Sequence, residues 1–423
     1  MSLCPPSADS LIHHRPFVLF WAARVCATVA MQMQAVAVGW QIYDLTNSPL
    51  DLGLVGLAQF LPALLLFLFT GHAADRYDRR TVLRICQFVE GCAVAVLAWG
   101  TFAGWITREL ILATALVIGA ARAFEAPALA ALLPTIVPPG LFPRAVAGSA
   151  SANQFATIAG PAAGGLIYAA NPVAAYAASS ALFIAASILV ALIPILTKVS
   201  LRGPFSIASL FAGFRFIWRH PIVLGAISLD MFAVLLGGAT ALLPVFARDI
   251  LHTDAQGLGL LRASPAVGAL AVSLALAWWP MRRRVGPIMY ACVAVFGVAT
   301  IVFALSRSMA LSIAALAVLG AVDLVSVVIR STLVQLATPD VMRGRVSAVN
   351  SLFIGTSNQL GEFRAGAMAA LIGAVPAALV GGIGTLVIVA LWIRLFPPLF
   401  HVDEMQAITP AAAPPIKSAA TGS

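Results

Sequence analysis

Ionisable residues stand in the middle of long apolar stretches of this sequence, where a charge is costly. Arg122 and Glu125 are three residues apart, so they share one helical face and can pair with each other. Asp323 precedes Arg330 by two helical turns in another stretch. A charge at the centre of a bilayer costs about 2.5–3.5 kcal/mol on insertion scales. These residues indicate either ion pairs that neutralise each other or a polar path for protons and substrate.

Two interpretations of Arg122 and Glu125 stay open at this point. In the first, they form a structural ion pair. In the second, Arg122 biases Glu125, which binds and releases a proton as its surroundings change. We interpret Glu90 as a residue that pairs locally. The full set predicted to line a proton and substrate pathway is Arg24, Gln32, Arg122, Glu125, Asp230, Asp323, Arg330, Asn358, Glu362 and Arg364.

The segment "NQLGEFRAG" brings two of these charges close together in sequence. Glu362 and Arg364 are two residues apart, so they do not face each other on a helix. Each needs a partner on another helix, or water in a cavity. The sequence leaves open whether they fasten helices together or take part in transport.

Other kinds of chemistry find no support in the motifs. The chain has two lysines, Lys198 and Lys417, and neither lies in a G-x-x-x-x-G-K-[ST] phosphate-binding loop. Neither H-E-x-x-H nor G-x-S-x-G occurs, and the five cysteines are scattered singly. We therefore expect no enzyme, no ATPase domain, no metal and no cofactor. A proton gradient is the expected energy source.

The composition indicates a membrane protein. Of the 423 residues, 61% are hydrophobic and 10% are charged, and the mean hydropathy is +0.98. Soluble domains are about 45–50% apolar and about 25% charged. The net charge of +9 does not predict nucleic-acid binding, because the arginines lie in short loops between apolar segments. The expected partners are the lipid bilayer and a small-molecule substrate.

Twelve apolar segments are long enough to cross a bilayer, which needs about 20 residues. The longest connection is amphipathic and separates two halves, so the predicted regions are 1–197, the connection 198–220, 221–397 and a disordered tail 398–423. The predicted spans are 17–43, 50–72, 82–103, 109–133, 146–169, 173–197, 221–247, 257–280, 286–305, 309–336, 346–372 and 375–397.

The loop charges predict the orientation. When loops are assigned alternately to the two sides, one side receives seventeen Lys and Arg residues and the other receives three. Cytoplasmic loops carry the excess of basic residues. We therefore predict an even number of spans, both termini in the cytoplasm, and a multi-pass protein of the bacterial cytoplasmic membrane. We expect it to be a monomer.

A dense charge cluster lies between the second and third predicted spans, in the sequence "GHAADRYDRR". Its residues Gly71, Asp75, Arg76, Arg79 and Arg80 resemble the loop signature of the major facilitator superfamily. The second Gly of that signature is replaced here by Asp78. The resemblance implies an all-α fold of twelve membrane helices in two pseudo-symmetric bundles of six, a secondary transporter that works by alternating access.

Further stretches resemble the branch of that superfamily that contains the enterobactin exporter and multidrug efflux proteins. They are "VAVGWQIYDLT", "ADRYDRRTVL", "SLFAGFRFIWRHP" and "TPDVMRGRVSAV". The sequence "GPAAGG", with Gly160, Pro161, Gly164 and Gly165, resembles the core of a motif associated with antiporters. A purely physical interpretation stays open, because small residues four apart also let membrane helices pack closely.

The resemblance also implies a role for Asp75. In this superfamily the matching carboxylate closes the cytoplasmic side by contacting the positive N-terminal end of span eleven and a basic residue of span four. Asp75→Asn is therefore expected to abolish transport in a vesicle assay while membrane insertion, measured by protease protection, stays normal. Normal transport by this variant would contradict the latch hypothesis.

The sequence thus favours a proton antiporter that exports a small organic molecule such as a siderophore, a drug or a metabolite. The alternative is an ion-coupled or facilitative importer of a small nutrient with the same fold. A pathway with both Arg and acidic residues does not distinguish anionic, cationic and zwitterionic substrates.

Overall fold

The computed structural model describes residues 14–194, 207–238, 240–279, 281 and 283–404, with the side chains of 67–76, 139, 207–210, 340 and 341 outside the description. The described residues are helical and contain no strand. The helices of the first half of the chain are α1 (Arg15–Thr46), α2 (Pro49–Arg76), α3 (Arg79–Phe102), α4 (Arg108–Ile136), α5 (Phe142–Ala170) and α6 (Pro172–Ala191). The second half has α7 (Ile207–Arg219), α8 (Pro221–Gly237), α9 (Leu243–Val245), α10 (Ala255–Trp278), α11 (Val285–Leu305), α12 (Met309–Ala337), α13 (Asp340–Ile372), α14 (Ala374–Leu395) and α15 (Pro397–Phe400).

Short connections with capping residues separate the long helices. Asn47 ends α1 in the left-handed conformation, with φ of 48°, and Pro49 begins α2. Asn171 caps α6, since its side chain accepts hydrogen bonds from the backbone N–H groups of Val173 and Ala174. Asn, Asp and Pro suit these positions because their side chains or fixed φ satisfy the first turn of a helix. Such short turns reverse the chain, so consecutive long helices run in opposite directions.

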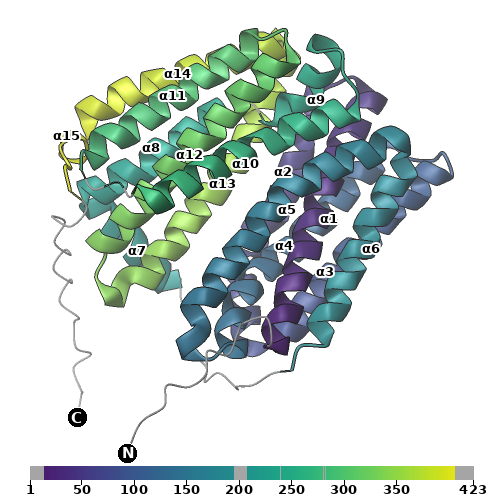
Figure 1. The fold of residues 1–423 in the computed structure, drawn as a ribbon, viewed down its shortest axis with the longest axis horizontal. Helices are drawn as coiled ribbons and strands as arrows, with labels where there is room; N and C mark the ends of the chain where they lie inside the picture. Colours follow the sequence, from purple (N-terminus) through teal and green to yellow (C-terminus); the bar gives the residue numbers. More distant parts are fainter. Residues whose placement is uncertain (1–13, 195–206, 239, 280, 282, 405–423) are drawn as a thin grey trace, which may run out of the picture.

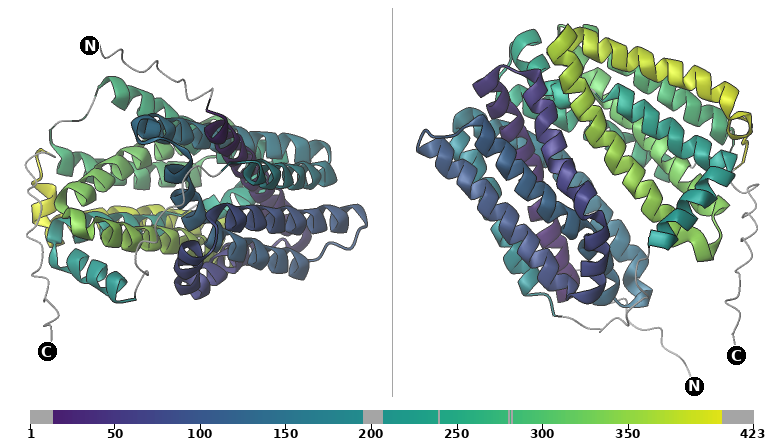
Figure 2. Two further views of the ribbon diagram at one scale, coloured as in Figure 1. Left: turned by 90° about the horizontal axis from the view of Figure 1, so that it is seen from below. Right: turned by 180° about the vertical axis from the view of Figure 1, so that it is seen from behind.

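The helices form two groups that meet at one end of the molecule and diverge toward the other (Figure 1). Helices α1–α6 pack on one another in the first group, and α8 and α10–α14 pack on one another in the second. We call the end at which α1 begins and α2 ends the basic face, because it carries Arg15, Arg79, Arg80 and Arg144. The opposite end is the far face. Figure 2 shows the same divergence from behind.

Ten helices of the described residues are long and apolar enough to cross a membrane. The predicted spans 146–169 and 346–372 correspond to helices α5 and α13, which are not among the ten. Both carry many small or polar residues, and both contact the opposite group of helices, α5 through α10 and α13 through α2. The count of twelve spans stays a prediction.

The seventh predicted span, 221–247, is not one continuous helix. Helix α8 ends at Gly237, and a 3₁₀ turn (Thr240–Leu242), the short α9 and a π-helical turn (Phe246–Ile250) follow it. Residues Pro221–Ile250 are still long and apolar enough to form one candidate membrane span, as predicted. The helix within it is interrupted because consecutive glycines, Gly237 and Gly238, weaken it. The break leaves free carbonyl groups at the end of α8.

Candidate functional site

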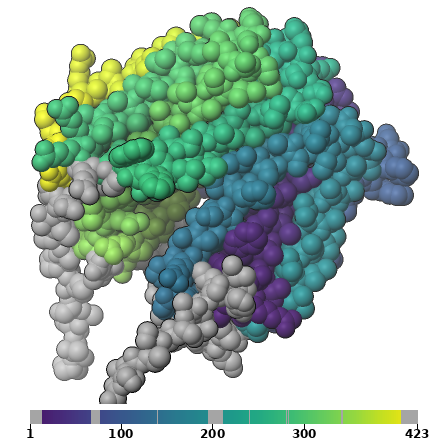
Figure 3. Space-filling model, viewed as in Figure 1, coloured from purple at the N-terminus to yellow at the C-terminus, as the bar shows by residue number. Residues whose placement is uncertain are grey.

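The two groups of helices approach each other most closely through glycines. On α5 and α10, a Cβ added to Gly165 would stand 2.9 Å from the Cα of Gly259. On α2 and α13, a Cβ added to Gly53 would stand 2.9 Å from the carbonyl oxygen of Phe363. Gln154, at mid-depth of α5, donates a hydrogen bond of 2.7 Å to the carbonyl of Ala266 on α10. Contact between the groups therefore extends from mid-depth to the far face, and Figure 3 shows them separated toward the basic face.

The four residues of the antiporter-like motif lie on two sides of α5. Gly160 and Gly164 face α1, where an added Cβ would meet Gln32 at 2.6 Å and Met33 at 2.7 Å. Pro161 and Gly165 face α10 in the other group of helices. The motif therefore packs α5 against α1 of the first group and, at the same depth, against α10 of the second group. This geometry is what small residues achieve in membrane helices, and it leaves the antiport function of the motif a prediction.

A cluster of polar side chains fills the interior of the first group. Arg122 on α4 lies 3.7 Å from a carboxylate oxygen of Glu90 on α3, and donates a hydrogen bond of 3.3 Å to Gln59 on α2. The Glu90 side chain is 1% exposed, and that of Arg122 is 27% exposed. Glu125 accepts a hydrogen bond of 3.2 Å from Gln87 on α3. Arg24 on α1 lies within range of the Glu125 charge. We call these six residues the first charge cluster.

The expected ion pair between Arg122 and Glu125 differs from the one observed. Although the two residues share a helical face, Arg122 turns toward Glu90 on the neighbouring helix. Glu125 is bound instead by an uncharged amide donor. The i, i+3 spacing made the local pair possible, but a more deeply buried carboxylate on α3 competes for the same guanidinium. This leaves Glu125 without a direct positive partner among the described residues.

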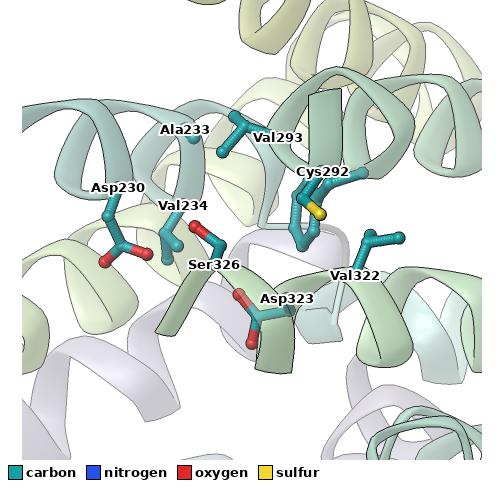
Figure 4. A pocket seen from close by; sticks show the side chains of 9 residues that line it. Asp230, Ala233, Val234, Cys292, Val293, Val322, Asp323 and Ser326 are labelled. Carbon is teal, nitrogen blue, oxygen red and sulfur yellow. The ribbon is translucent and has the colours of Figure 1, made fainter. Parts of the chain in front are cut away.

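A second charge cluster lies within the other group, between α8 and α12. Arg330 and Asp230 form an ion pair of 2.9 Å, and both side chains are buried. Asp323 lies two turns from Arg330 and makes no hydrogen bond within the described part of the chain. Its carboxylate lines a small cavity together with Asp230 and Ser326 (Figure 4). The cavity has a volume of about 10 Å³, enough for about one water molecule.

Two further charges of the second group lie where it meets the first. Glu362 on α13 lies against Gly56 of α2, where an added Cβ would stand 2.9 Å from its carboxylate. Arg262 on α10 lies against Gly39 of α1, where an added Cβ would stand 3.3 Å from its guanidinium. Glu362 lies within range of the charges of both Arg262 and Arg122. Glu362 thus lies at mid-depth between the two groups of helices, near charges of both.

Arg364 lies apart from this interface. Its guanidinium donates to the backbone carbonyls of Leu235 (2.8 Å) and Leu236 at the end of α8. These carbonyls have no partner within the helix, because α8 stops at Gly237. A cation is also favoured at a helix C-terminus. Arg364 therefore fastens α13 to the broken end of α8.

At the basic face, the loop after α2 ties helices together. Asp78 caps α3, since its carboxylate accepts hydrogen bonds from the Arg80 backbone N–H and the Thr81 hydroxyl. Arg79 donates to the carbonyl of Ala131 near the end of α4, at 3.1 Å. Arg80 donates to the carbonyl of Ile193 just beyond α6, at 2.8 Å. Asp78, where the family signature has Gly, thus has a structural role as an N-cap.

The other residues of the proposed latch, Gly71, Asp75 and Arg76, belong to α2, but their side chains lie outside the described residues. Arg122 does not match the span-four partner proposed for Asp75. It contacts Gln59, which precedes Asp75 by sixteen residues on α2. At 1.5 Å per residue this separation is about 24 Å along the helix. In this conformation Arg122 belongs to the first charge cluster.

At the far face, a polar contact joins the end of α1 to the π-helical turn. The hydroxyl of Tyr43 donates a hydrogen bond to the Asp249 carboxylate. Arg248 forms an ion pair of 3.3 Å with Asp44, and its guanidinium carbon lies 5.7 Å from the centre of the Tyr43 ring. We call these four residues the far-face clasp. It closes the end at which the two groups of helices meet.

The sequence prediction missed several residues of these clusters. Arg262 lies inside the predicted span 257–280. It could have been identified in the same way as Arg122, because a charge within a membrane span is costly. Gln87 stands three residues before Glu90 and faces the same way. Gln59 and the clasp had no distinguishing sequence signal. Of the remaining predicted residues, Gln32 is half-buried against Gly160, and Asn358 is exposed.

A family model and two curated relatives place this chain among membrane transporters. Residues 7–421 match a family of the major facilitator superfamily described as transmembrane secretion effector. The enterobactin exporter EntS of Escherichia coli K12 is 26% identical over 419 residues, which cover 92% of this chain and 94% of the relative. The enterobactin exporter EntS of Citrobacter koseri is 27% identical over 410 residues, covering 90% and 92%.

Two solved structures share the fold. A bacterial homologue of the human lysosomal transporter Spinster, in an inward-facing and unoccupied conformation, superposes with a TM-score of 0.69 at 12% identity. The match covers 92% of this chain and 96% of that one. The nucleoside transporter NupG, as a mutant, gives a TM-score of 0.72 at 12% identity, covering 90% of this chain and 100% of that one. At these identities the likeness concerns the fold.

Proposed function

This chain belongs to the transmembrane secretion effector family of the major facilitator superfamily, and from that premise we propose that it is a proton antiporter that exports a small organic molecule by alternating access. It is a multi-pass membrane protein and a transporter, not an enzyme. The observation that supports the mechanism best is that the two groups of helices are in contact from mid-depth to the far face and separate toward the basic face, with buried charges near the depth at which they separate.

In this proposal the two halves of the chain, residues 1–197 and 221–397, rock against each other as a twelve-span monomer. The basic face is cytoplasmic, since it carries the arginine-rich loops. The conformation described above is then open to the cytoplasm and closed by the far-face clasp. Export requires the clasp to break and the basic face to close, and the residues Asp75, Arg76, Arg79 and Arg80 serve that closure.

The proton would be carried by carboxylates that lack a direct positive partner. Glu125 in the first group is bound by an amide, and Asp323 in the second lines a cavity with room for about one water molecule. Intramembrane carboxylates are the usual relays of proton-coupled transporters. The remaining polar groups, including Arg24 and Arg122, would contact the substrate when the basic face is open.

The relatives suggest the first substrate to test. Those described above are named as exporters of enterobactin, a siderophore, and they match this chain over nearly its whole length. We therefore propose an organic metabolite of that kind as the cargo.

Everted membrane vesicles test both the direction and the coupling. In vesicles with an acidified interior, added enterobactin should enter and release protons, because antiport exchanges the two. Glu125→Gln and Asp323→Asn should each reduce this proton release at least about tenfold, a change of about 1.4 kcal/mol in the barrier.

Glu109→Gln is the matched control, since Glu109 is an exposed carboxylate beside Arg108 at the far face. It should transport as the wild type does. Unchanged proton release in both buried variants would contradict proton coupling through these residues. Substrate entry only in vesicles of the opposite orientation would indicate an importer.

A further inference from the structure

Helix α7 packs on the second group of helices with one face. Gly213 lies against α13, where an added Cβ would stand 2.8 Å from the carbonyl oxygen of Arg345. Phe216 and Ile217 are buried in a cluster with Val346 and other residues of α8, α12 and α13. This face accounts for the apolar residues that α7 buries within the protein. It also fixes α7 beside the beginning of α13 (Figure 1).

The opposite face of α7 is aromatic and mostly exposed, although the ring of Phe214 lies 6.3 Å from that of Phe353 on α13. Phe211, Phe214 and Trp218 recur at the spacing of one helical face, and they are 69%, 42% and 65% exposed. The rings of Phe214 and Trp218 stack at 5.7 Å. Three large apolar side chains on one short helix are an unusual surface to leave in water.

Two arginines border this aromatic face. Arg215 and Arg219 are exposed, and no ion pair with a carboxylate involves either of them in the described part of the chain. The helix therefore presents a strip of aromatic rings beside a strip of unpaired positive charge. Helices with this pattern lie in the membrane interface, with rings among the acyl chains and cations among the headgroups.

The chain itself fixes the depth of α7. One residue, His220, separates it from α8, which begins at Pro221 and starts a candidate membrane span. Since a spanning helix begins at the bilayer surface, the end of α7 must lie at that surface, on the basic face. Its exposed aromatic side chains can then leave water only by entering the lipid.

We propose that α7 is an interfacial helix that binds anionic phospholipids, with the three aromatic rings in the acyl region and Arg215 and Arg219 on the headgroup phosphates. Two unpaired arginines favour an anionic lipid over a zwitterionic one, because each adds electrostatic attraction at the surface. This inference concerns the membrane contact alone and is independent of what the protein transports.

Fluorescence quenching by brominated lipids tests the proposal. The protein is placed in nanodiscs of one fixed mixture of phosphatidylglycerol and phosphatidylcholine, with bromine on the acyl chains of either the first or the second lipid. The contribution of Trp218 is the difference between the wild type and Trp218→Phe. We expect brominated phosphatidylglycerol to quench Trp218 at least about twofold more, per mole of brominated lipid, than brominated phosphatidylcholine.

Two variants separate the charge effect from simple immersion. Arg215→Gln combined with Arg219→Gln should remove the preference while quenching of Trp218 persists. Arg283→Gln, which changes an exposed arginine elsewhere on the basic face, should keep the preference. Absence of quenching by either lipid would overturn the proposal, because it would show that α7 lies outside the bilayer. This result is expected if another protein or a second copy of this chain covers α7. Equal quenching by both lipids, or an unchanged preference in the double variant, would also overturn the proposal.

Discussion

Gly165→Val is expected to abolish transport while leaving the protein folded. Gly165 is the point at which α5 touches the backbone of α10, and an added side chain would overlap Gly259 and the carbonyl of Ala255. Backbone atoms cannot turn aside as a flexible side chain can. Overpacking of this kind costs about 1–3 kcal/mol. Because the overlap exists only when the far face is closed, the cost should lower the ratio of closed to open molecules about 5- to 150-fold.

The shift can be measured at a position that is buried only in the closed state. Val36 of α1 is fully buried against residues of the opposite group of helices. In a background without the five native cysteines, Val36→Cys should react slowly with an impermeant thiol reagent applied from the far face. Adding Gly165→Val should speed this reaction by up to the factor by which it shifts the equilibrium toward the open state, because the rate follows the open population.

Gly355→Val is the control for a glycine on a helix of the same interface. Gly355 lies on α13, and no atom lies within 4 Å of an added Cβ there. This variant should transport within about twofold of the wild type, since a single helical glycine replacement costs little. Wild-type transport by Gly165→Val, or loss of its folded state in size-exclusion chromatography, would contradict the argument.

Much of the fold could be predicted from the sequence because lipid imposes a simple rule. Long apolar runs, interrupted by short turns with Asn and Pro, fixed the approximate positions of α1 and α6. The break after α8 could not be predicted, because Gly237 and Gly238 look like the small residues common in membrane helices. What distinguishes them is Arg364, which binds the carbonyls that the break sets free. That contact joins residues more than a hundred positions apart.

In the candidate site, too, the buried charges could be predicted from the local sequence, whereas their partners depend on how the helices pack. The cost of burying charge identified Arg122 and Arg330 from sequence alone. Their partners could not be identified, because Arg122 pairs with Glu90 on another helix and not with its neighbour Glu125. Likewise the sequence showed that Glu362 needs a partner, but the glycine surface of α2 that it rests on appears only when the helices are assembled.

The ion pair between Arg330 and Asp230 should have the largest effect on stability in the second group of helices. Both side chains are almost fully buried, and their charged atoms lie 2.9 Å apart. Removing one partner of a buried pair leaves an uncompensated charge and costs about 3–5 kcal/mol. Arg330→Met is therefore expected to lower the free energy of unfolding by about that amount, measured by titration with SDS in mixed micelles.

A second substitution shows whether the loss comes from the unpaired charge. Replacing both partners, by Arg330→Met with Asp230→Leu, removes the charge as well as the bond, and buried pairs exchanged for apolar residues are often neutral or stabilising. We expect the double variant to regain most of the stability while transport stays impaired, because Asp323 then loses the charged neighbours beside its cavity. A double variant as unstable as Arg330→Met would show that packing of the arginine stem, and not charge compensation, holds α8 and α12 together.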